Sequence, residues 1–362
     1  MTQATRVHVA VPNAPYDVHV GEGVLQGIAA ATAGADRVAV VSDREVCALH
    51  GDLRRHGVDA PMLEFDGGES IKTLGVLEEV LDFCAASSLS RSSILVAYGG
   101  GTVGDLTGMA ASLFKRGLRV IQVPTTLLAQ VDASVGGKTA INLAAGKNLA
   151  GTFHQPHAVF CDTGLLGTLS EAEYQSGLGE VIKTALIEGE PALAQLESIS
   201  RDLGARAVTA LSDTVARCVT TKARVVVSDP EERGARRSLN LGHTFAHAIE
   251  HAAGYGRVPH GIAVAVGLQL AASASERVYA SSTDLGERIG RLLSAFGLPA
   301  DLEELRSRYS LGAALTANAL IEGLGHDKKG RVGAPEFVLM RGPGDIELGV
   351  MIAEEELRDL LA

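Results

Sequence analysis

The sequence predicts two domains: a mostly parallel α/β sheet over residues 1–169 and an all-helical domain over residues 170–362. Three observations support this. The chain has 362 residues, more than the ~250–300 at which a single core usually stops growing. Short apolar runs alternate with helical periodicity in the first half, which is typical of a parallel sheet covered by helices. Long helical patterns replace the strands in the second half.

The elements of the first half follow in order from these patterns. Residues 7–20 alternate apolar and polar side chains around Pro12-Asn13-Ala14-Pro15, which predicts an opening hairpin. Further strands are expected at 37–43, 60–66, 92–98 and 118–124. Helices are expected from residue 44 to about 56, and over 70–87 and 103–115.

The second half is dominated by helical periodicity. Helices are expected over 170–188, 191–201, 205–228, 238–254, 260–280, 284–296 and 314–325. One late hairpin, from 336–340 to 345–349, interrupts them.

Composition excludes several classes of protein. The apolar stretches are far shorter than the ~20 residues of a membrane helix, and the N-terminus lacks the continuous apolar core of a secretory signal. The four cysteines show no C-x-x-C spacing, which suits a reducing compartment. A net charge of −11 argues against binding to nucleic acid. We therefore expect a cytoplasmic protein with neither a membrane nor a nucleic-acid partner.

Two glycine-rich segments are candidate phosphate sites. Gly99, Gly101 and Gly104 match G-x-G-x-x-G between a strand and a helix, where backbone can approach a pyrophosphate; a plain tight turn is the alternative. Gly137-Lys138-Thr139 is similar to the end of a nucleotide-triphosphate loop, but Asp132 stands where that loop needs glycine and would repel phosphate. Lysine-bearing turns at 136–138 and 146–148 favour a small anion instead, with solvated lysines as the alternative.

A histidine cluster predicts a metal site. His243 and His247 stand at positions i and i+4 and share a helix face, and His260 begins the next helix. Glu180, in an otherwise apolar helix with Lys183, needs a partner if buried. Two histidines and one carboxylate leave open positions on a catalytic zinc ion. Spacing alone does not choose among the three histidines.

Together these motifs resemble the 3-dehydroquinate synthase family of sugar phosphate cyclases. The resemblance covers nearly the whole chain and is densest in GGGTVGDLTGMAA (99–111), RGLRVIQVPTTLLAQVDASVGGKTAIN (116–142), GKN (146–148), SGLGEVIK (176–183), LNLGHTFAHAIE (239–250), PHG (259–261) and DKK (327–329). It implies a Rossmann-like NAD-binding domain, a helical domain that binds substrate and one divalent ion per chain, zinc or cobalt, and a homodimer.

The resemblance also implies a role for individual residues. The metal ligands it implies are Glu180, His243 and His260. The NAD contacts are Asp43, Glu69, Lys72, Gly100, Gly101, Thr102, Val103, Gly104, Asp105, Thr125, Thr126, Lys138 and Lys147. The substrate contacts are Asp132, Lys138, Lys147, Asn148, Lys183, Lys222, Arg236, Asn240, His247 and Lys328, with Arg116 reaching across from the partner subunit. The seven cations suit a substrate with a phosphate and a carboxylate.

The implied reaction is the second step of the shikimate pathway. The C5 hydroxyl of 3-deoxy-D-arabino-heptulosonate 7-phosphate is oxidised transiently by NAD, phosphate is eliminated, the ketone is reduced again, and an aldol closure gives 3-dehydroquinate. Lys183, Arg236, Leu239 and Asn240 favour this branch over cyclases of the aminodehydroquinate or valiolone type. An iron-type polyol dehydrogenase would leave NADH behind, and a non-enzymatic NAD-binding regulator would lack part of the ligand or lysine set.

Overall fold

The computed structural model describes residues 4–280, 284–326 and 335–362. The chain divides into two compact units, 1–170 with 208–231, and 171–207 with 232–362. The segment 208–231 thus groups with the first unit, although its sequence continues the helical pattern of the second half. The predicted domain boundary at residue 169 stays a prediction.

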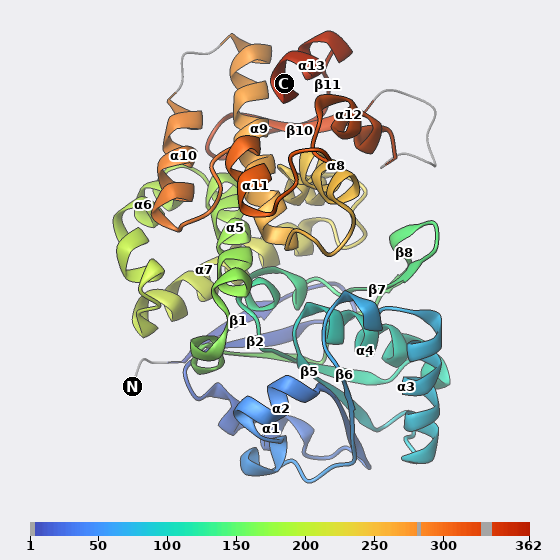
Figure 1. Cartoon of the computed structure of the whole chain (residues 1–362). Coiled ribbons are helices and arrows are strands. Elements are labelled where there is room, and N and C mark those ends of the chain that lie inside the picture. Colours follow the sequence, from blue (N-terminus) through green and yellow to red (C-terminus); the bar gives the residue numbers. More distant parts are fainter. Residues whose placement is uncertain (1–3, 281–283, 327–334) are drawn as a thin grey trace. The chain divides into compact units, whose positions relative to one another are not determined.

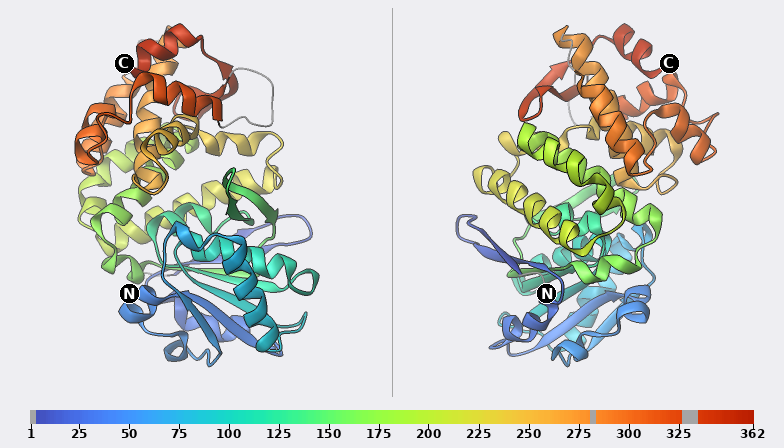
Figure 2. Two further views of the ribbon diagram at one scale, coloured as in Figure 1. Left: turned by 45° about the vertical axis from the view of Figure 1, so that its right-hand side comes forward. Right: turned by 90° about the vertical axis from the view of Figure 1, so that its left-hand side faces the viewer.

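The first unit is built on a seven-stranded sheet of order β1-β2-β9-β6-β5-β3-β4 (Figure 1). Its strands are β1 (Thr5–Val9), β2 (Tyr16–Gly21), β3 (Val38–Asp43), β4 (Met62–Phe65), β5 (Ile94–Gly99), β6 (Arg119–Pro124) and β9 (Ala158–Asp162). β1 pairs antiparallel with β2, and the other described pairs are parallel. The predicted opening hairpin and the mostly parallel sheet are confirmed; Figure 2 shows that hairpin in dark blue at one side.

Both faces of this sheet are covered. One core contains Leu95 and Ala97 of β5, packed with α3 (Leu74–Ala86) and α4 (Gly101–Leu113). The other contains Val96 and Tyr98, whose side chains point to the opposite face. It is closed by η1 (Val24–Gly27), α1 (Ile28–Thr32) and η2 (Leu53–His56), with α2 (Arg44–His50) beside them. Because helices cover both faces, a ligand of this unit would reach the sheet at the loops that follow its strands.

The segment between β6 and β9 contains structure that the sequence analysis does not predict. A π-helical turn, η5 (Ala129–Ala133), is followed by an antiparallel hairpin of β7 (Lys138–Leu143) and β8 (Gly146–Phe153). Thr139 and Ile141 are buried on one face of β7, so the two-residue period is present. Glycines at both strand starts, which suggest turns, obscure this period. The lysines expected in two turns lie on this hairpin.

Among its described residues, the second unit is helical apart from the hairpin of β10 (Glu336–Gly342) and β11 (Asp345–Met351). Its helices are α5 (Glu171–Glu188), α6 (Glu190–Gly204), α8 (His243–Ala253), α9 (His260–Tyr279), α10 (Leu285–Ala295), α11 (Leu302–Arg308), α12 (Ala317–His326) and α13 (Glu354–Leu361). The predicted helical domain with one late hairpin is confirmed, while α11 and α13 were not predicted. α7 (Val208–Ser228) belongs to the first unit.

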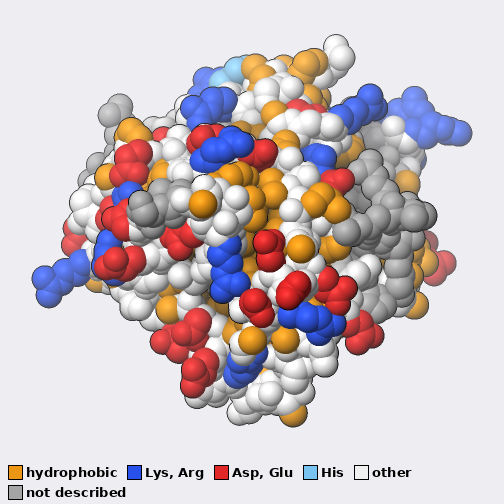
Figure 3. Space-filling model, turned by 90° about the horizontal axis from the view of Figure 1, so that it is seen from above, with side chains coloured by type: hydrophobic (Ala, Val, Ile, Leu, Met, Phe, Trp, Pro, Cys, Tyr) orange, Lys and Arg blue, Asp and Glu red, His pale blue; other side chains and the backbone are white. Residues whose placement is uncertain are grey.

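Two surface properties bear on partners. None of the described helices is long and apolar enough to span a bilayer. On the face shown in Figure 3, acidic and basic side chains are interspersed around apolar ones.

Candidate active site

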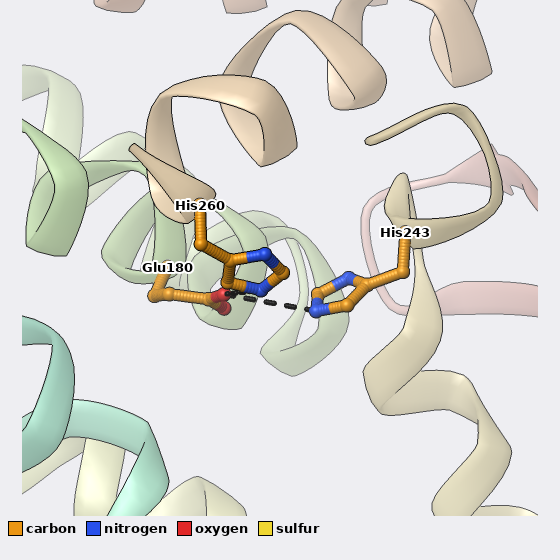
Figure 4. A group of neighbouring side chains, drawn as sticks. All are labelled: Glu180, His243 and His260. Atoms are coloured by element: carbon orange, nitrogen blue, oxygen red, sulfur yellow. Dashed lines mark ion pairs between the residues drawn. The ribbon is translucent and has the colours of Figure 1, made fainter. Parts of the chain in front are cut away.

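Three donor side chains of the second unit converge on one point. The ligand atoms of Glu180, His243 and His260 all lie within 4.8 Å of one another (Figure 4). The Nε2 atoms of both histidines lie 3.7 Å from the same carboxylate oxygen, Oε1 of Glu180. Ligands at about 2.1 Å from a tetrahedral zinc ion are roughly 3.4 Å apart. The donor set and its spacing therefore fit a divalent ion with one coordination position left open.

Close helix packing sets this spacing. Glu180 lies in the middle of α5, and His260 is the first residue of α9. Next to His260, Gly261 donates its backbone N–H to Oγ of Ser176, one turn before Glu180, at 3.0 Å. A Cβ atom on Gly261 would lie 1.7 Å from the carbonyl oxygen of Ser176. Glycine at this position therefore allows α9 to bring His260 beside α5.

The third donor, His243, is the first residue of α8. Its Nδ1 lies 3.2 Å from the carbonyl oxygen of Leu241, which leaves Nε2 facing Glu180. His247 lies one turn later, and its ring centroid is 5.8 Å from that of His243 and 6.2 Å from that of His260. The sequence left the choice among the three histidines open; the geometry places His243 and His260 nearest to the carboxylate.

Three further predicted substrate residues, Lys183, Arg236 and Asn240, belong to the second unit. Nζ of Lys183 lies 2.5 Å from Oε2 of Glu180, and both side chains are buried. Arg236 is fully buried in the 3-10 helix η7 (Ala235–Asn240). Asn240 ends that helix and donates from Nδ2 to Oε1 of Glu232 at 3.3 Å. Buried charges are costly unless they are paired, and the Glu180 carboxylate lies beside the buried Lys183 side chain.

In the first unit, the predicted cofactor residues lie along one edge of the sheet. β3 ends at Asp43, β5 ends at Gly99, and β6 is followed by Thr125 and Thr126. Since these strands are parallel and neighbours, their carboxyl ends share an edge. The chain leaves β3 for β4 on one side and β5 for β6 on the other. Such a topological switch point is where open α/β sheets bind their ligands.

The glycine turn fits a pyrophosphate at this edge. Gly100 precedes α4, and Gly101, Thr102 and Val103 form its first turn, whose N–H groups have no acceptor within the helix. A Cβ on Gly104 would lie 2.8 Å from Oε1 of Gln122 in β6. Nε2 of Gln122 also donates to the carbonyl oxygen of Gly104 at 3.1 Å, so α4 contacts β6 close to the N-terminus of the helix. The turn thus has the form that a dinucleotide requires.

A buried lysine joins this turn to the β7–β8 hairpin. Nζ of Lys72 lies 2.7 Å from Oδ2 of Asp105 and 2.5 Å from Oδ1 of Asn148. Asn142 donates from Nδ2 to Oε1 of Glu69 at 2.7 Å and accepts from the Asn148 N–H at 2.9 Å. Burial raises the pKa of the Asp105 carboxyl, and nearby Lys72 acts in the opposite direction. Predicted cofactor and substrate residues are therefore connected here.

The remaining predicted residues occupy different settings. Asp132 lies on η5, where Lys222 of α7 pairs with its carboxylate and donates to its backbone oxygen at 2.6 Å. Lys138 and Lys147 lie on the β7–β8 hairpin. Arg116 is exposed and makes no ion pair or side-chain hydrogen bond with the described part of the chain. Lys328 lies outside the described residues.

Two side-chain contacts to predicted site residues are not predicted from the sequence. Asn142 links Glu69 to Asn148, and no local pattern signals this contact, because it depends on the hairpin. Glu250 lies 3.2 Å from Nδ1 of His260. Its position seven residues after His243 could have indicated it, because residues separated by two helical turns share a face.

Comparison with known proteins gives matches over most of the chain. The family described as 3-dehydroquinate synthase N-terminal matches residues 62–176, and that described as 3-dehydroquinate synthase C-terminal matches residues 177–330. The 3-dehydroquinate synthase of Ruegeria pomeroyi is 41% identical over 347 residues, covering 93% of this chain and 92% of the relative. That of Halorhodospira halophila is 42% identical over 348 residues, covering 96% of each.

Solved structures with a similar fold include two sugar phosphate cyclases. A 2-deoxy-scyllo-inosose synthase in complex with carbaglucose-6-phosphate, NAD⁺ and Co²⁺ is 26% identical, with a TM-score of 0.85 over 99% of each chain. The 2-epi-5-epi-valiolone synthase of Streptomyces hygroscopicus, with NAD⁺ and Zn²⁺ bound, is 28% identical, with a TM-score of 0.85 over 97% of each chain. An iron-containing alcohol dehydrogenase of Thermococcus thioreducens, 18% identical with a TM-score of 0.61, shares the fold.

Proposed function

The chain belongs to the 3-dehydroquinate synthase family, and on that premise we propose that it converts 3-deoxy-D-arabino-heptulosonate 7-phosphate to 3-dehydroquinate and phosphate. The observation that carries the proposal is the convergence of Glu180, His243 and His260 in a chain that matches the family over nearly its full length. The reaction is that of a carbon–oxygen lyase acting on a phosphate.

We assign NAD to the first unit and one divalent ion, zinc or cobalt, to the second. When bound, NAD supplies a reversible hydride acceptor and the ion supplies a Lewis acid that polarises substrate oxygens. Asp43 at the end of β3 suits the adenosine ribose, because a carboxylate accepts hydrogen bonds from its hydroxyl groups. The start of α4 suits the pyrophosphate.

The chain's own residues hold the two anionic groups of the substrate. We assign the C1 carboxylate to Lys222, Arg236 and Asn240, and the phosphate to Lys138, Lys147, Asn148, His247 and Lys328. Charge-assisted hydrogen bonds of this kind are short and about twice as strong as neutral ones. Lys183 is buried beside Glu180, so a substrate oxygen near the ion would also meet an ammonium group.

Phosphate release from purified protein tests the proposal. We expect rapid release from the heptulosonate 7-phosphate in the presence of catalytic NAD and zinc, without NADH accumulating in proportion to product. Sedoheptulose 7-phosphate, which lacks the carboxylate, should react poorly. Stoichiometric NADH formation would instead indicate a dehydrogenase, and rapid turnover of sedoheptulose 7-phosphate would indicate a valiolone-type cyclase.

We also propose a homodimer in which Arg116 serves the partner's substrate. Its support is that Arg116 is exposed and has no side-chain hydrogen bond or ion pair among the described residues. Mixing inactive Arg116→Ala and Lys183→Ala proteins under conditions of subunit exchange should restore activity, because each mixed dimer then contains one intact site. If activity does not return although mixed dimers form, Arg116 acts within its own subunit or not at all.

A further inference from the structure

A buried carboxylate lies behind one of the three convergent donors. Oε2 of Glu250 is 3.2 Å from Nδ1 of His260, and Glu250 is 3% exposed. The other nitrogen of the same ring, Nε2, lies 3.7 Å from Glu180. The two ring nitrogens of an imidazole point in different directions, so Glu250 contacts the side of the ring that faces away from Glu180.

Helix register explains how Glu250 reaches this place. His243, His247 and Glu250 are related by i, i+4 and i+7 in α8, and side chains at this spacing lie on one helix face. The rings of His243 and His260 are 5.3 Å apart, so this face of α8 meets the start of α9. His243 thus contributes a donor at the first turn, and Glu250 supports the donor from α9 two turns later.

The surroundings of Glu250 disfavour an ionised carboxylate. Glu250 is buried, as are Ile249 and Ala253 of the same helix, and a buried ionised group is costly unless it is paired. It also lies in the last turn of the helix, where the macrodipole disfavours negative charge. For the equivalent nitrogen of His243, the acceptor is the uncharged carbonyl group of Leu241.

We propose that Glu250 is a positioning residue that holds the proton of His260 on Nδ1 and so turns Nε2 toward the metal position. The inference rests on the metal site of the proposed function. A carboxylate that accepts from the distal N–H of a metal-binding histidine fixes the tautomer and the ring orientation, and makes the ligating nitrogen more basic. Glu250 acts through His260 and is not itself a ligand.

Co²⁺ binding to the purified full chain tests this inference without relying on turnover. Glu250→Ala should still bind one Co²⁺ per chain, with affinity about 10- to 100-fold lower in competition with a chelator. Glu250→Gln should lose less affinity, because an amide oxygen still accepts from Nδ1–H. The absorption bands of bound Co²⁺ should shift in Glu250→Ala. Ile249→Val, a mild change at a buried neighbour in α8, should bind Co²⁺ like the wild type.

Nitrogen chemical shifts provide a second measurement, which Glu250→Gln keeps available if Glu250→Ala fails to fold. In the metal-free wild type, His260 should carry its proton on Nδ1, and this tautomer should become less populated in a Glu250 variant. Wild-type affinity, spectrum and tautomer in the variants would overturn the inference. Complete loss of Co²⁺, as expected for Glu180→Ala, would also overturn it, because Glu250 would then be a ligand. If the wild type binds Co²⁺ no better than His243→Ala, the proposed metal site fails as well.

Discussion

Lys183 and Glu180 form an ion pair one helical turn apart in α5, with Nζ 2.5 Å from Oε2 and each side chain about 2% exposed. The other oxygen of the same carboxylate faces Nε2 of both His243 and His260. The carboxylate therefore lies between the Lys183 side chain and the proposed metal position. We therefore expect the stability of the second unit to depend on metal binding.

Replacing Lys183 by methionine tests this coupling. The change leaves the Glu180 carboxylate buried without its cation and should lower the free energy of unfolding of the metal-free protein by about 3 kcal/mol. Zinc should restore part of the loss, so the zinc-induced rise in Tm should be larger in Lys183→Met than in the wild type. Thermal denaturation with zinc and with a chelator measures this rise. Lys222→Met, which removes a lysine paired with Asp132, should show the wild-type rise.

The metal ligands can be separated from their histidine neighbour. Purified wild-type protein should contain about one divalent ion per chain, and Glu180→Ala, His243→Ala and His260→Ala should each lose it together with activity. His247→Ala should retain the ion and lose turnover, because its ring lies beside the three donors without belonging to them. Elemental analysis after gel filtration measures the metal content. Equal loss in all four variants would contradict the assignment.

Close packing of α9 on α5 at Gly261 should be needed for metal binding, as the three ligand side chains are. A Cβ at this position would lie 1.7 Å from the Ser176 carbonyl oxygen, so Gly261→Ala must push α9 away from α5. We expect a loss of about 3 kcal/mol in unfolding free energy from overpacking, with weaker Co²⁺ binding because His260 moves. Gly290→Ala, in α10 where the nearest atom is 3.9 Å away, should stabilise the protein slightly. Denaturant unfolding and Co²⁺ titration of both variants test this prediction.

Three histidines of the first unit should make the folded protein less stable at low pH. Burial lowers the pKa values of His19, His50 and His157 below their ordinary value of 6.5. The unfolded chain therefore binds protons at these histidines more readily than the folded chain does. The free energy of unfolding is not reduced by these groups above about pH 6.5, and it falls as the pH drops through the lowered pKa values. Unfolding free energies at pH 8 and pH 5.5 should show this loss. His19→Phe, which can keep the stacking on Phe160, should reduce it; an unchanged pH dependence would contradict the prediction.

Regular local patterns account for what could be predicted from the sequence. The alternation of Leu95 and Ala97 with Val96 and Tyr98 comes from a strand buried on both faces, and the long helices carry strong periodicity. The β7–β8 hairpin was missed because glycines interrupt its pattern. α11, with 7 residues, and α13, with 8, are too short to establish a clear helical period.

The candidate site shows a similar division. Residue type and spacing predicted a histidine and carboxylate cluster, but the choice of His260 over His247 depends on the crossing of α5 and α9 at Gly261, which is a tertiary contact. The contact of Asn142 with Glu69 spans 73 residues along the chain. Such contacts leave no periodic trace, so side chains that act by orienting other side chains are the hardest to find from one sequence.

Substrate choice should depend on Arg236. This residue is 1% exposed, and we assign it to the substrate carboxylate together with Asn240. A substrate without the carboxylate cannot accept charge-assisted hydrogen bonds from this guanidinium group, so the wild type should prefer the heptulosonate over sedoheptulose 7-phosphate by about 10³-fold in kcat/KM. Arg236→Ala should narrow that ratio by lowering kcat/KM for the carboxylate substrate selectively. Arg236→Lys keeps the charge but loses the planar fork of donors. Its ratio of kcat/KM values for the two sugars should lie between those of the wild type and Arg236→Ala. If Arg236→Ala lowered kcat/KM equally for both sugars, Arg236 would have a general structural role, and the dehydroquinate assignment would lose its basis in carboxylate recognition.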